Sequence, residues 1–189
     1  RQANYLDQSL SAEEYNKTIQ PSAIMTIQAQ FDQLIHGIVT TINDILCPNK
    51  KVTLSDGTEV FILDTDRAPA GTDSNRTVGE ALFNRKNMQR YSDPVDITLI
   101  DGTVITGARI YNEENSANNY SLFTLGEIEV NRNILNNNSK LPLSKNSLTG
   151  DYDIETVTQL ISAWRQPYAA LSPNHLTKYS FSDYYNAFI

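Results

Sequence analysis

The chain has 189 residues, of which 40% are hydrophobic and 20% charged, and its formal net charge is -7. This charge disfavours a nucleic acid or an anionic membrane as a partner, because either requires clustered basic side chains, and only Arg85, Lys86 and Arg90 gather locally. No apolar run approaches the roughly 20 residues of a membrane-spanning helix, so we expect neither nucleic acid nor a membrane as a partner.

Residues 1–20 are predicted to be a lead-in segment that contains one short helix. Ser11 and Glu14 have the S-x-x-E spacing of a capping box, in which each residue satisfies a free N–H at the start of a helix. We therefore expect a helix over residues 12–19, with Tyr15 and Ile19 facing inward.

A long amphipathic helix is predicted over Ser22–Leu46. Its hydrophobic residues recur with heptad spacing, and the seam consists of Ile24, Ile27, Phe31, Leu34, Ile38 and Ile45. The apolar stripe is wider than a two-stranded coiled coil needs, which favours a helix lying against a bundle or sheet. Gly37 costs about 1 kcal/mol relative to Ala, so a second helix is expected to approach closely there. Cys47, the one cysteine, excludes an internal disulfide and is expected to be a small buried side chain.

Two β-hairpins are predicted after Pro48. In residues 51–61 and again in residues 96–106, alternating hydrophobic residues flank an Asp-Gly pair, a strong hairpin signal. The two hairpins either share one antiparallel sheet or carry the same T-L-x-D-G-T motif only because it makes a good turn. Residues 64–75 are expected to form a polar loop, and residues 78–91 to contain a short helix on Ala81, Leu82 and Phe83.

The last part of the chain is predicted to be mainly helical. Ile128 and Val130 indicate a short strand, and the Asn-rich residues 131–140 indicate a turn or irregular helix anchored by Ile134 and Leu135. Asp153 is a good N-cap for a helix to about Ala170, which Pro167 is expected to bend or split. Its apolar positions are Val157, Leu160, Ile161 and Trp164. A further helix is predicted from Ser182 to the end of the chain.

The sequence predicts no catalytic, cofactor-binding or metal-binding residues. His36 lies beside the seam of the long helix, and His175 follows a turn-forming segment, so neither is expected to act as a base. Asp64, Asp66 and Asp73 resemble a calcium loop, but Pro69 stands where such a loop requires Gly. A third group, Asp151, Asp153 and Glu155, opens a helix, where its dipole favours acidic residues. We therefore interpret these carboxylates as loop and capping residues.

Short motifs in a fixed order carry a resemblance to a known family. After a strand come a V-N pair, an I-L pair, an Asn-rich turn and a G-D pair, namely Val130-Asn131, Ile134-Leu135, residues 136–138 and Gly150-Asp151. An F-x-D-x-Y motif follows at Phe181, Asp183 and Tyr185, and Ile42-Asn43 lies upstream in the long helix. In these features, and in residues 125–144 as a whole, the chain resembles the flagellar hook-filament junction proteins (FlgK), with the form of clostridial-type members.

This resemblance implies a structural, non-catalytic part of the bacterial flagellum that joins hook to filament and serves motility. It implies export through the flagellar type III apparatus to the cell exterior. The implied partners are the hook protein, neighbouring junction or hook-associated proteins, further copies of the full-length protein, and an export chaperone. The terminal heptad segments of the family are missing, so the chain is interpreted as a fragment. A cysteine is unusual in such axial proteins.

The expected fold is α+β, a long-helix bundle domain with an inserted small antiparallel β-hairpin domain. Residues 21–47 and 125–189 are assigned to a helical rod-like domain, and residues 48–124 to the inserted β-rich domain. Two other functions remain open. A secreted or surface-exposed module that binds glycan or protein would show exposed aromatic side chains on the β region. A hydrolase would need two of the carboxylates Asp151, Asp153 and Glu155 facing each other across a cleft.

Overall fold

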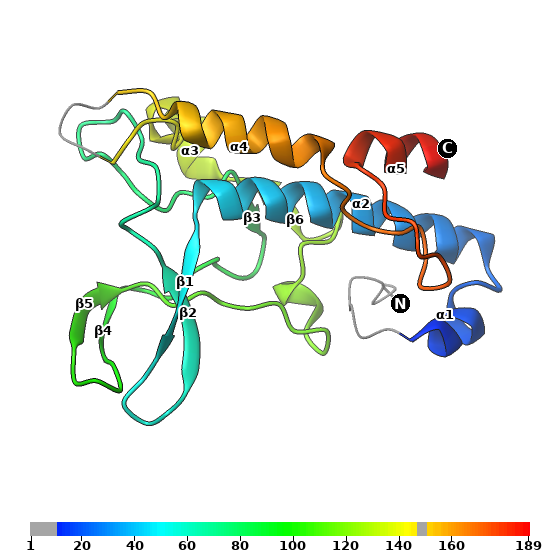
Figure 1. Cartoon of the computed structure of the whole chain (residues 1–189), viewed down its shortest axis with the longest axis horizontal. Helices are drawn as coiled ribbons and strands as arrows, with labels where there is room; N and C mark the ends of the chain where they lie inside the picture. The colour runs from blue at the N-terminus through cyan, green and yellow to red at the C-terminus, as the bar shows by residue number, and fades with distance from the viewer. Residues whose placement is uncertain (1–10, 147–150) are drawn as a thin grey trace.

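The computed structural model describes residues 11–146 and 151–189, and it is an α+β structure (Figure 1). Its helices are α1 (Ala12–Thr18), α2 (Ala23–Leu46), α3 (Arg132–Asn136), α4 (Ile154–Arg165) and α5 (Phe181–Phe188), with 3-10 turns η1 (Asn119–Ser121) and η2 (Asn138–Lys140). Its strands are β1 (Asn49–Thr53), β2 (Glu59–Leu63), β3 (Phe83–Arg85), β4 (Val95–Thr98), β5 (Val104–Ala108) and β6 (Ile128–Val130). The strands pair as three two-stranded antiparallel sheets. The α+β class is confirmed.

Each of the two N-terminal helices begins directly after a serine that caps it. Ser11 and Glu14 make the predicted capping box of α1, and Ser22 caps α2 by accepting a hydrogen bond from the Met25 N–H. Tyr15 and Ile19 are buried against the first turns of α2, as predicted. Residues 1–10 of the predicted lead-in segment lie outside the described residues.

Helices α4 and α5 lie one after the other along the same side of α2 (Figure 1). α4 ends at Arg165, earlier than the predicted Ala170, because Pro167 disfavours helical geometry at Gln166, which adopts an extended conformation. The chain after Pro167 instead forms a β-bridge between Ala169 and Tyr179. α5 begins one residue before the predicted Ser182 and is capped by Ser180.

Gly37 is a point of close contact, but the contact is an aromatic ring and not the predicted second helix. A Cβ atom at this position would overlap with the ring of Tyr168. The Tyr168 hydroxyl donates a hydrogen bond to the backbone carbonyl of Gln33 at 2.8 Å, one turn earlier in α2. The glycine therefore makes room for a tyrosine that attaches the segment after α4 to α2.

We expect Gly37→Ala to destabilise the chain by about 2 kcal/mol, because overpacking outweighs the gain in helix propensity. Tyr168→Ala removes the ring, so adding Gly37→Ala to it should cost nothing further. Urea unfolding of the two single variants and the double variant measures this coupling. Additive losses would show that Tyr168 is not what Gly37 accommodates.

Both predicted hairpins are present, as β1–β2 and β4–β5. They are two separate sheets, joined at their edges by isolated bridges between Leu54 and Leu99 and between Ile62 and Ile110. Side chains from both hairpins share one small core, which includes Ile62, Ile97 and Ala108. Of the two alternatives left by the sequence, one shared sheet or two unrelated hairpins, neither holds fully. The hairpins pack together but do not form one sheet.

Residues 83–85 are a strand and not the predicted short helix. β3 pairs with β6, about 45 residues later in the chain, which a local helical pattern cannot reveal. The fully buried Asn43 of α2 fixes this strand, because its amide donates to the Phe83 carbonyl at 2.9 Å and accepts from the Phe83 N–H at 3.0 Å. One side chain therefore satisfies both backbone groups of Phe83.

Asn131 holds the segment that leads into this strand. Its side chain caps α3 by accepting from the Asn133 N–H at 2.9 Å, and its amide donates to the Ala81 carbonyl at 2.8 Å. Ile134 is buried as predicted, but Leu135 is 67% exposed, because in this five-residue helix only one of two adjacent side chains can face inward. The predicted Asn-rich turn is thus a short α-helix followed by η2.

The largest core cluster lies at the C-terminal end of α2. Leu46 and Cys47 pack there with the last residue of β2, with residues on either side of β3 and with side chains from the last part of the chain, namely Leu63, Ala68, Ala81, Tyr91, Leu141, Leu143 and Leu160. This cluster includes residues from both predicted domains. The division into two domains stays a prediction.

Candidate assembly surface

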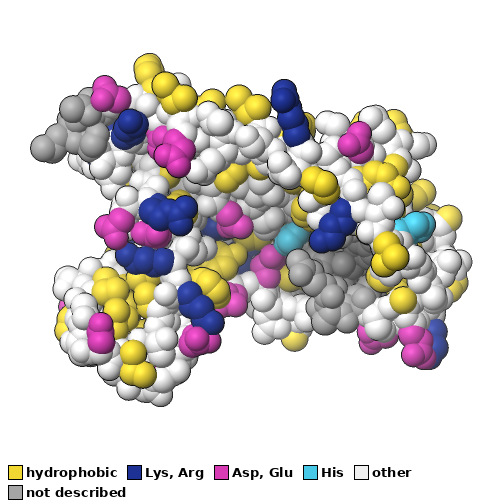
Figure 2. Space-filling view, in the orientation of Figure 1, with side chains coloured by type: hydrophobic (Ala, Val, Ile, Leu, Met, Phe, Trp, Pro, Cys, Tyr) yellow, Lys and Arg dark blue, Asp and Glu magenta, His cyan; other side chains and the backbone are white. Residues whose placement is uncertain are grey.

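The outer side of α4 carries an apolar stripe that nothing in the described chain covers. Ile154, Val157, Ile161 and Trp164 follow helical spacing and are 74%, 41%, 55% and 45% exposed. Figure 2 shows hydrophobic side chains gathered along this edge of the molecule, over α4. The helix turns a different set of side chains, with Thr156 and Leu160, toward the rest of the protein. Three of the four stripe residues were recognised from the sequence as apolar helix positions, but their exposure was not.

The stripe continues into a groove where α4 meets α5. The groove has a volume of about 380 Å³ and is lined by Leu34, Ile38, Trp164, Phe181 and Tyr185, with two polar residues of α5. Aromatic rings pack against one another beneath it. The ring centroid of Phe181 lies 5.3 Å from that of Trp164 and 4.9 Å from that of Tyr168. An apolar groove beside an exposed apolar stripe is the type of surface that another protein segment covers.

The first turns of α2 also expose part of the predicted seam. Ile24 and Ile27 are 71% and 54% exposed, while Leu34 farther along the seam is buried. The heptad pattern therefore predicts the helix correctly but only partly predicts what is buried. In all, three helices expose side chains of the kind that form interfaces; we call the stripe of α4 together with its groove the assembly surface.

Four of the carboxylates considered in the sequence, Asp64, Asp66, Asp73 and Asp153, have local partners. Asp153 caps α4 by accepting from the Thr156 N–H at 3.1 Å. Asp73 accepts from the Thr77 N–H and hydroxyl, while Lys50 lies 3.6 Å from Asp64 and 3.0 Å from Asp66. In the described ranges no three His, Cys, Asp or Glu side chains are placed to hold a metal ion. That the chain has no catalytic site stays a prediction.

The two histidines occupy different surroundings. His175 accepts or donates a hydrogen bond with the Ser172 hydroxyl at 2.8 Å and stays within a turn. His36 of α2 lies 2.7 Å from Glu114, which belongs to the segment before η1. Burial alone would raise the pKa of Glu114, but the hydrogen bond and charge of His36 and the hydrogen bond from the Phe123 N–H more than offset it. The pKa of Glu114 therefore lies below its usual range.

We expect Glu114→Gln to lower the free energy of unfolding at neutral pH by about 2 kcal/mol, because charge-assisted hydrogen bonds are lost. A depressed carboxyl pKa stabilises the folded state above the ordinary value of 4.5, and this contribution is lost as the pH falls through the folded-state pKa. The difference between wild type and variant should therefore shrink on acidification below that value. Urea unfolding across the acid range measures it, with exposed Glu113→Gln as the control. A difference that does not change with pH would contradict this assignment.

Cys47 is a buried, inert thiol. Its side chain is fully buried in the cluster at the end of α2, and this burial raises the pKa of the thiol to about 12. Because the thiolate is the reactive form, a buried thiol of high pKa reacts slowly. The expectation of a small buried side chain is confirmed.

We expect the folded chain to resist a thiol-specific disulfide reagent at mildly alkaline pH and to react fully in guanidinium chloride. The absorbance of the released chromophore measures both rates. A Ser162→Cys variant, at an exposed position of α4, provides an immediately reactive thiol in the same fold. Equal rates for Cys47 before and after unfolding would contradict its burial.

Comparisons of the chain with protein families, with curated proteins and with solved structures find no match. None of the helices in residues 11–146 and 151–189 has the length and apolar character needed to span a bilayer.

Proposed function

We propose that the chain is a structural component of the bacterial flagellum, a hook-associated protein that joins hook to filament without catalysis. The observation that carries this proposal is the assembly surface. Four large apolar side chains on one helix are exposed to water and continue into an apolar groove. A monomeric protein seldom leaves such a contiguous patch uncovered, whereas a subunit of an axial assembly covers it with its neighbours.

The residues that carry the family resemblance support the proposal by having structural roles. Asn43 and Asn131 are buried, and they hold β3 and the residues just before it. Phe181 is buried where α2, α4 and α5 meet, and Asp183 accepts a hydrogen bond from the Ser180 hydroxyl at the start of α5. These motifs therefore specify a scaffold. Gly150 of the G-D pair lies outside the described residues.

On this proposal α2, α4 and α5 belong to a longer helical bundle, residues 21–47 and 125–189 form its rod-like domain, and residues 48–124 are an inserted β-rich domain. The protein is exported through the flagellar type III apparatus and functions outside the cell. Its full-length partners are the hook protein, neighbouring hook-associated proteins, other copies of itself and an export chaperone. Nucleic acid and membranes are not among them.

Complementation of a deletion strain tests the proposal and the surface together. Deleting the gene should leave cells with hooks but no filaments, non-motile and with flagellin in the medium, and the full-length gene should restore filaments. A full-length variant with Ile161→Ser and Trp164→Ser should be exported but should restore few filaments, because the surface that its neighbours cover has become polar. Filament counts by electron microscopy and spreading in soft agar measure both results.

A matched variant with Thr158→Ser and Gln159→Ser changes two exposed polar positions of the same helix and should restore filaments fully. Circular dichroism of the purified chain verifies that both variants fold. Normal filaments in the deletion strain would refute the flagellar function. Full restoration by the Ile161 and Trp164 variant would refute the role of the assembly surface.

A secreted or surface-exposed module that binds glycan or protein is the second candidate. The observation that favours it is a pair of exposed aromatic side chains in the β region, Phe61 at 37% and Tyr120 at 57%. These two come from β2 and η1, and aromatic rings of this type stack on sugars or insert into protein interfaces. A motile deletion strain that fails to adhere to a surface would favour this candidate.

A further inference from the structure

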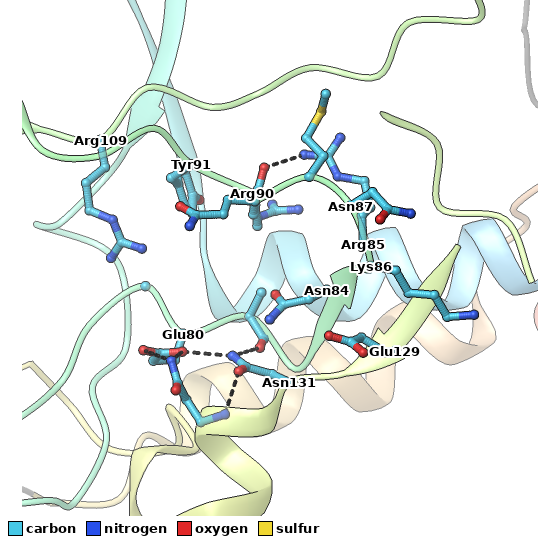
Figure 3. A pocket seen from close by; sticks show the side chains of 15 residues that line it. Glu80, Asn84, Arg85, Lys86, Asn87, Arg90, Tyr91, Arg109, Glu129 and Asn131 are labelled. Carbon is cyan, nitrogen blue, oxygen red and sulfur yellow. Dashed lines mark hydrogen bonds between the residues drawn. The ribbon is translucent and has the colours of Figure 1, made fainter. Parts of the chain in front are cut away.

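A polar cleft lies on the β3–β6 sheet, away from the assembly surface. Its volume is about 520 Å³, within the range of small-molecule sites, and it is bounded by β3, the loop after it, β6 and the start of α3 (Figure 3). Four basic and two acidic side chains line it, in a chain whose net charge is -7. The cleft is therefore a locally cationic site in an acidic protein.

Most of these cations have no carboxylate to balance them. Within the described residues, Arg85, Lys86 and Arg109 have no acidic oxygen within ion-pair distance, and Arg90 has one, Asp44 at 2.6 Å. Arg85 and Lys86 instead donate to backbone carbonyls, and Arg109 to the Val78 carbonyl at 3.1 Å. A buried or half-buried cation without a counter-ion is costly, and an anion in the cleft would relieve this cost.

The two buried guanidinium groups also retain unpaired N–H groups. Arg85 and Arg90 are 3% and 4% exposed, and among the described residues the Nε of Arg85 and the Nε and Nη1 of Arg90 have no hydrogen-bond partner. The Arg90 guanidinium lies 4.8 Å from the ring centroid of Tyr111 and 5.6 Å from that of Tyr91. These rings hold the guanidinium in place beside the cleft, where its positive charge, partly offset by Asp44, contributes to the local potential.

Arg109 is the guanidinium that reaches into the cleft itself. Figure 3 shows it on the side of Tyr91, while Asn84 and Asn131 lie on the opposite side. Its guanidinium lies 5.0 Å from the Tyr91 ring centroid, and it fits close to the backbone because Gly79, at φ +78°, has no side chain there. Such a fixed, planar group suits bidentate recognition of a carboxylate.

The cleft is also rich in amides. Asn84, Asn87, Gln89, Asn131 and Asn133 line it, and an amide carries both donors and an acceptor. The Asn131 amide is used within the protein, by Glu80, the Ala81 carbonyl and the Asn133 N–H, so the amides offered to a ligand are those of Asn84, Asn87 and Gln89. Side chains of this type bind hydroxyl groups, which also donate and accept. The cleft thus combines cationic groups for one negative charge with amides for several hydroxyls.

We propose that this cleft binds an acidic sugar, a hydroxyl-rich ligand with one carboxylate. The carboxylate pairs with Arg109 in the field of Arg90 and Lys86, and the hydroxyls bond to the amides of Asn84, Asn87 and Gln89. Glu80 accepts a hydrogen bond from Asn131 at 2.8 Å and repels the ligand's charge. The inference stands on the cleft alone and does not depend on the flagellar function.

Isothermal titration calorimetry of the whole chain tests it with D-glucuronate as the probe. D-glucose lacks the carboxylate, and acetate and inorganic phosphate lack the sugar hydroxyls, so each should bind at least about tenfold more weakly. A disaccharide that ends in glucuronate distinguishes a glycan terminus from a free sugar acid as the source of the ligand. Either source supports the proposal.

Two variants that change the net charge of the cleft in opposite directions make the test specific. Arg109→Gln should weaken glucuronate binding about tenfold, and Glu80→Gln should strengthen it about threefold, because one attraction and one repulsion are removed. Arg165→Gln, an exposed arginine at the end of α4, should change nothing. Circular dichroism verifies folding, and exposed Lys86→Gln, expected to weaken binding about threefold, replaces Arg109→Gln if that variant unfolds.

Three results would overturn the proposal. One is the absence of binding of both glucuronate and the disaccharide at millimolar concentration. Another is equal binding of glucose or acetate, which would show that charge or hydroxyls are not recognised. The third is equal weakening by Glu80→Gln and Arg109→Gln, which would indicate a change of fold and not of recognition.

Discussion

Replacing Asn43 by Leu is expected to lower the free energy of unfolding by about 3 kcal/mol. The substitution removes the two hydrogen bonds to the backbone of Phe83 and leaves a buried N–H and a buried carbonyl without partners. Because each orphaned group costs about 1–3 kcal/mol, the similar volume of Leu does not compensate. Urea unfolding followed by far-ultraviolet circular dichroism measures the loss.

A matched substitution on the same helix isolates the buried amide. Gln28→Leu also replaces an amide by Leu, but at an exposed position of α2, and should change the stability by less than about 0.5 kcal/mol. Asn43→Asp retains the acceptor for the Phe83 N–H but cannot donate to the carbonyl, so it should be destabilised as well. If Asn43→Leu proved as stable as Gln28→Leu, Asn43 would not be what holds β3 to α2.

Replacing Arg85 by Met is expected to have the larger effect, a loss of about 4 kcal/mol. The guanidinium donates to the carbonyls of Ser121 at 2.6 Å, Gln89 at 2.8 Å and Asn112 at 2.9 Å, and it lies 4.9 Å from the ring centroid of Phe123. It thereby connects β3 to two loops, and Met would leave three carbonyls without this donor. Part of the loss is recovered, because a buried positive charge is also removed.

Thermal and urea unfolding measure this loss against two controls. Arg85→Lys keeps the charge and one donor group, so its loss should fall between those of the wild type and Arg85→Met. Arg165→Met replaces an exposed arginine and should be neutral within about 0.5 kcal/mol. Equal stability of Arg85→Met and wild type would mean that the loops around Phe123 are held by other contacts.

The sequence predicts the local elements of this fold well. The capping box at Ser11, the N-cap at Asp153 and the Asp-Gly turns of both hairpins each depend on a few neighbouring residues, and all are present in the structure. Pro167 was recognised as an interruption, although the helix before it ends sooner than expected. Where the deciding contact is local, the physical rule and the structure agree.

The predictions that were wrong or incomplete concern contacts between residues that are far apart in the sequence. Ala81, Leu82 and Phe83 are apolar side chains that suit a helix or a strand, and the pairing of β3 with β6 and with Asn43 decides between the two. Gly37 indicates a close approach, but no pattern in the sequence identifies Tyr168 as the neighbour. The exposure of the α4 stripe was missed for the same reason, because helical spacing shows which residues share a face but not whether that face is covered.

The cleft on the β3–β6 sheet likewise depends on contacts that the sequence pattern does not reveal. Arg85, Lys86 and Arg90 were recognised as the one local basic group, but Arg109 joins them only through the fold. The amides come from β3, the loop after it and the start of α3, segments up to about 50 residues apart. Composition argues against a nucleic-acid partner, but it does not reveal a cationic cleft in an acidic chain.

The most direct test of the central claim is to locate the full-length protein on isolated flagella. Antibodies raised against the purified chain, detected with gold particles by electron microscopy, should mark a single band between the curved hook and the filament, and should mark nothing on flagella of the deletion strain. Labelling along the cell surface, or flagella without label while the protein is present elsewhere in the culture, would contradict the junction function and favour the binding module.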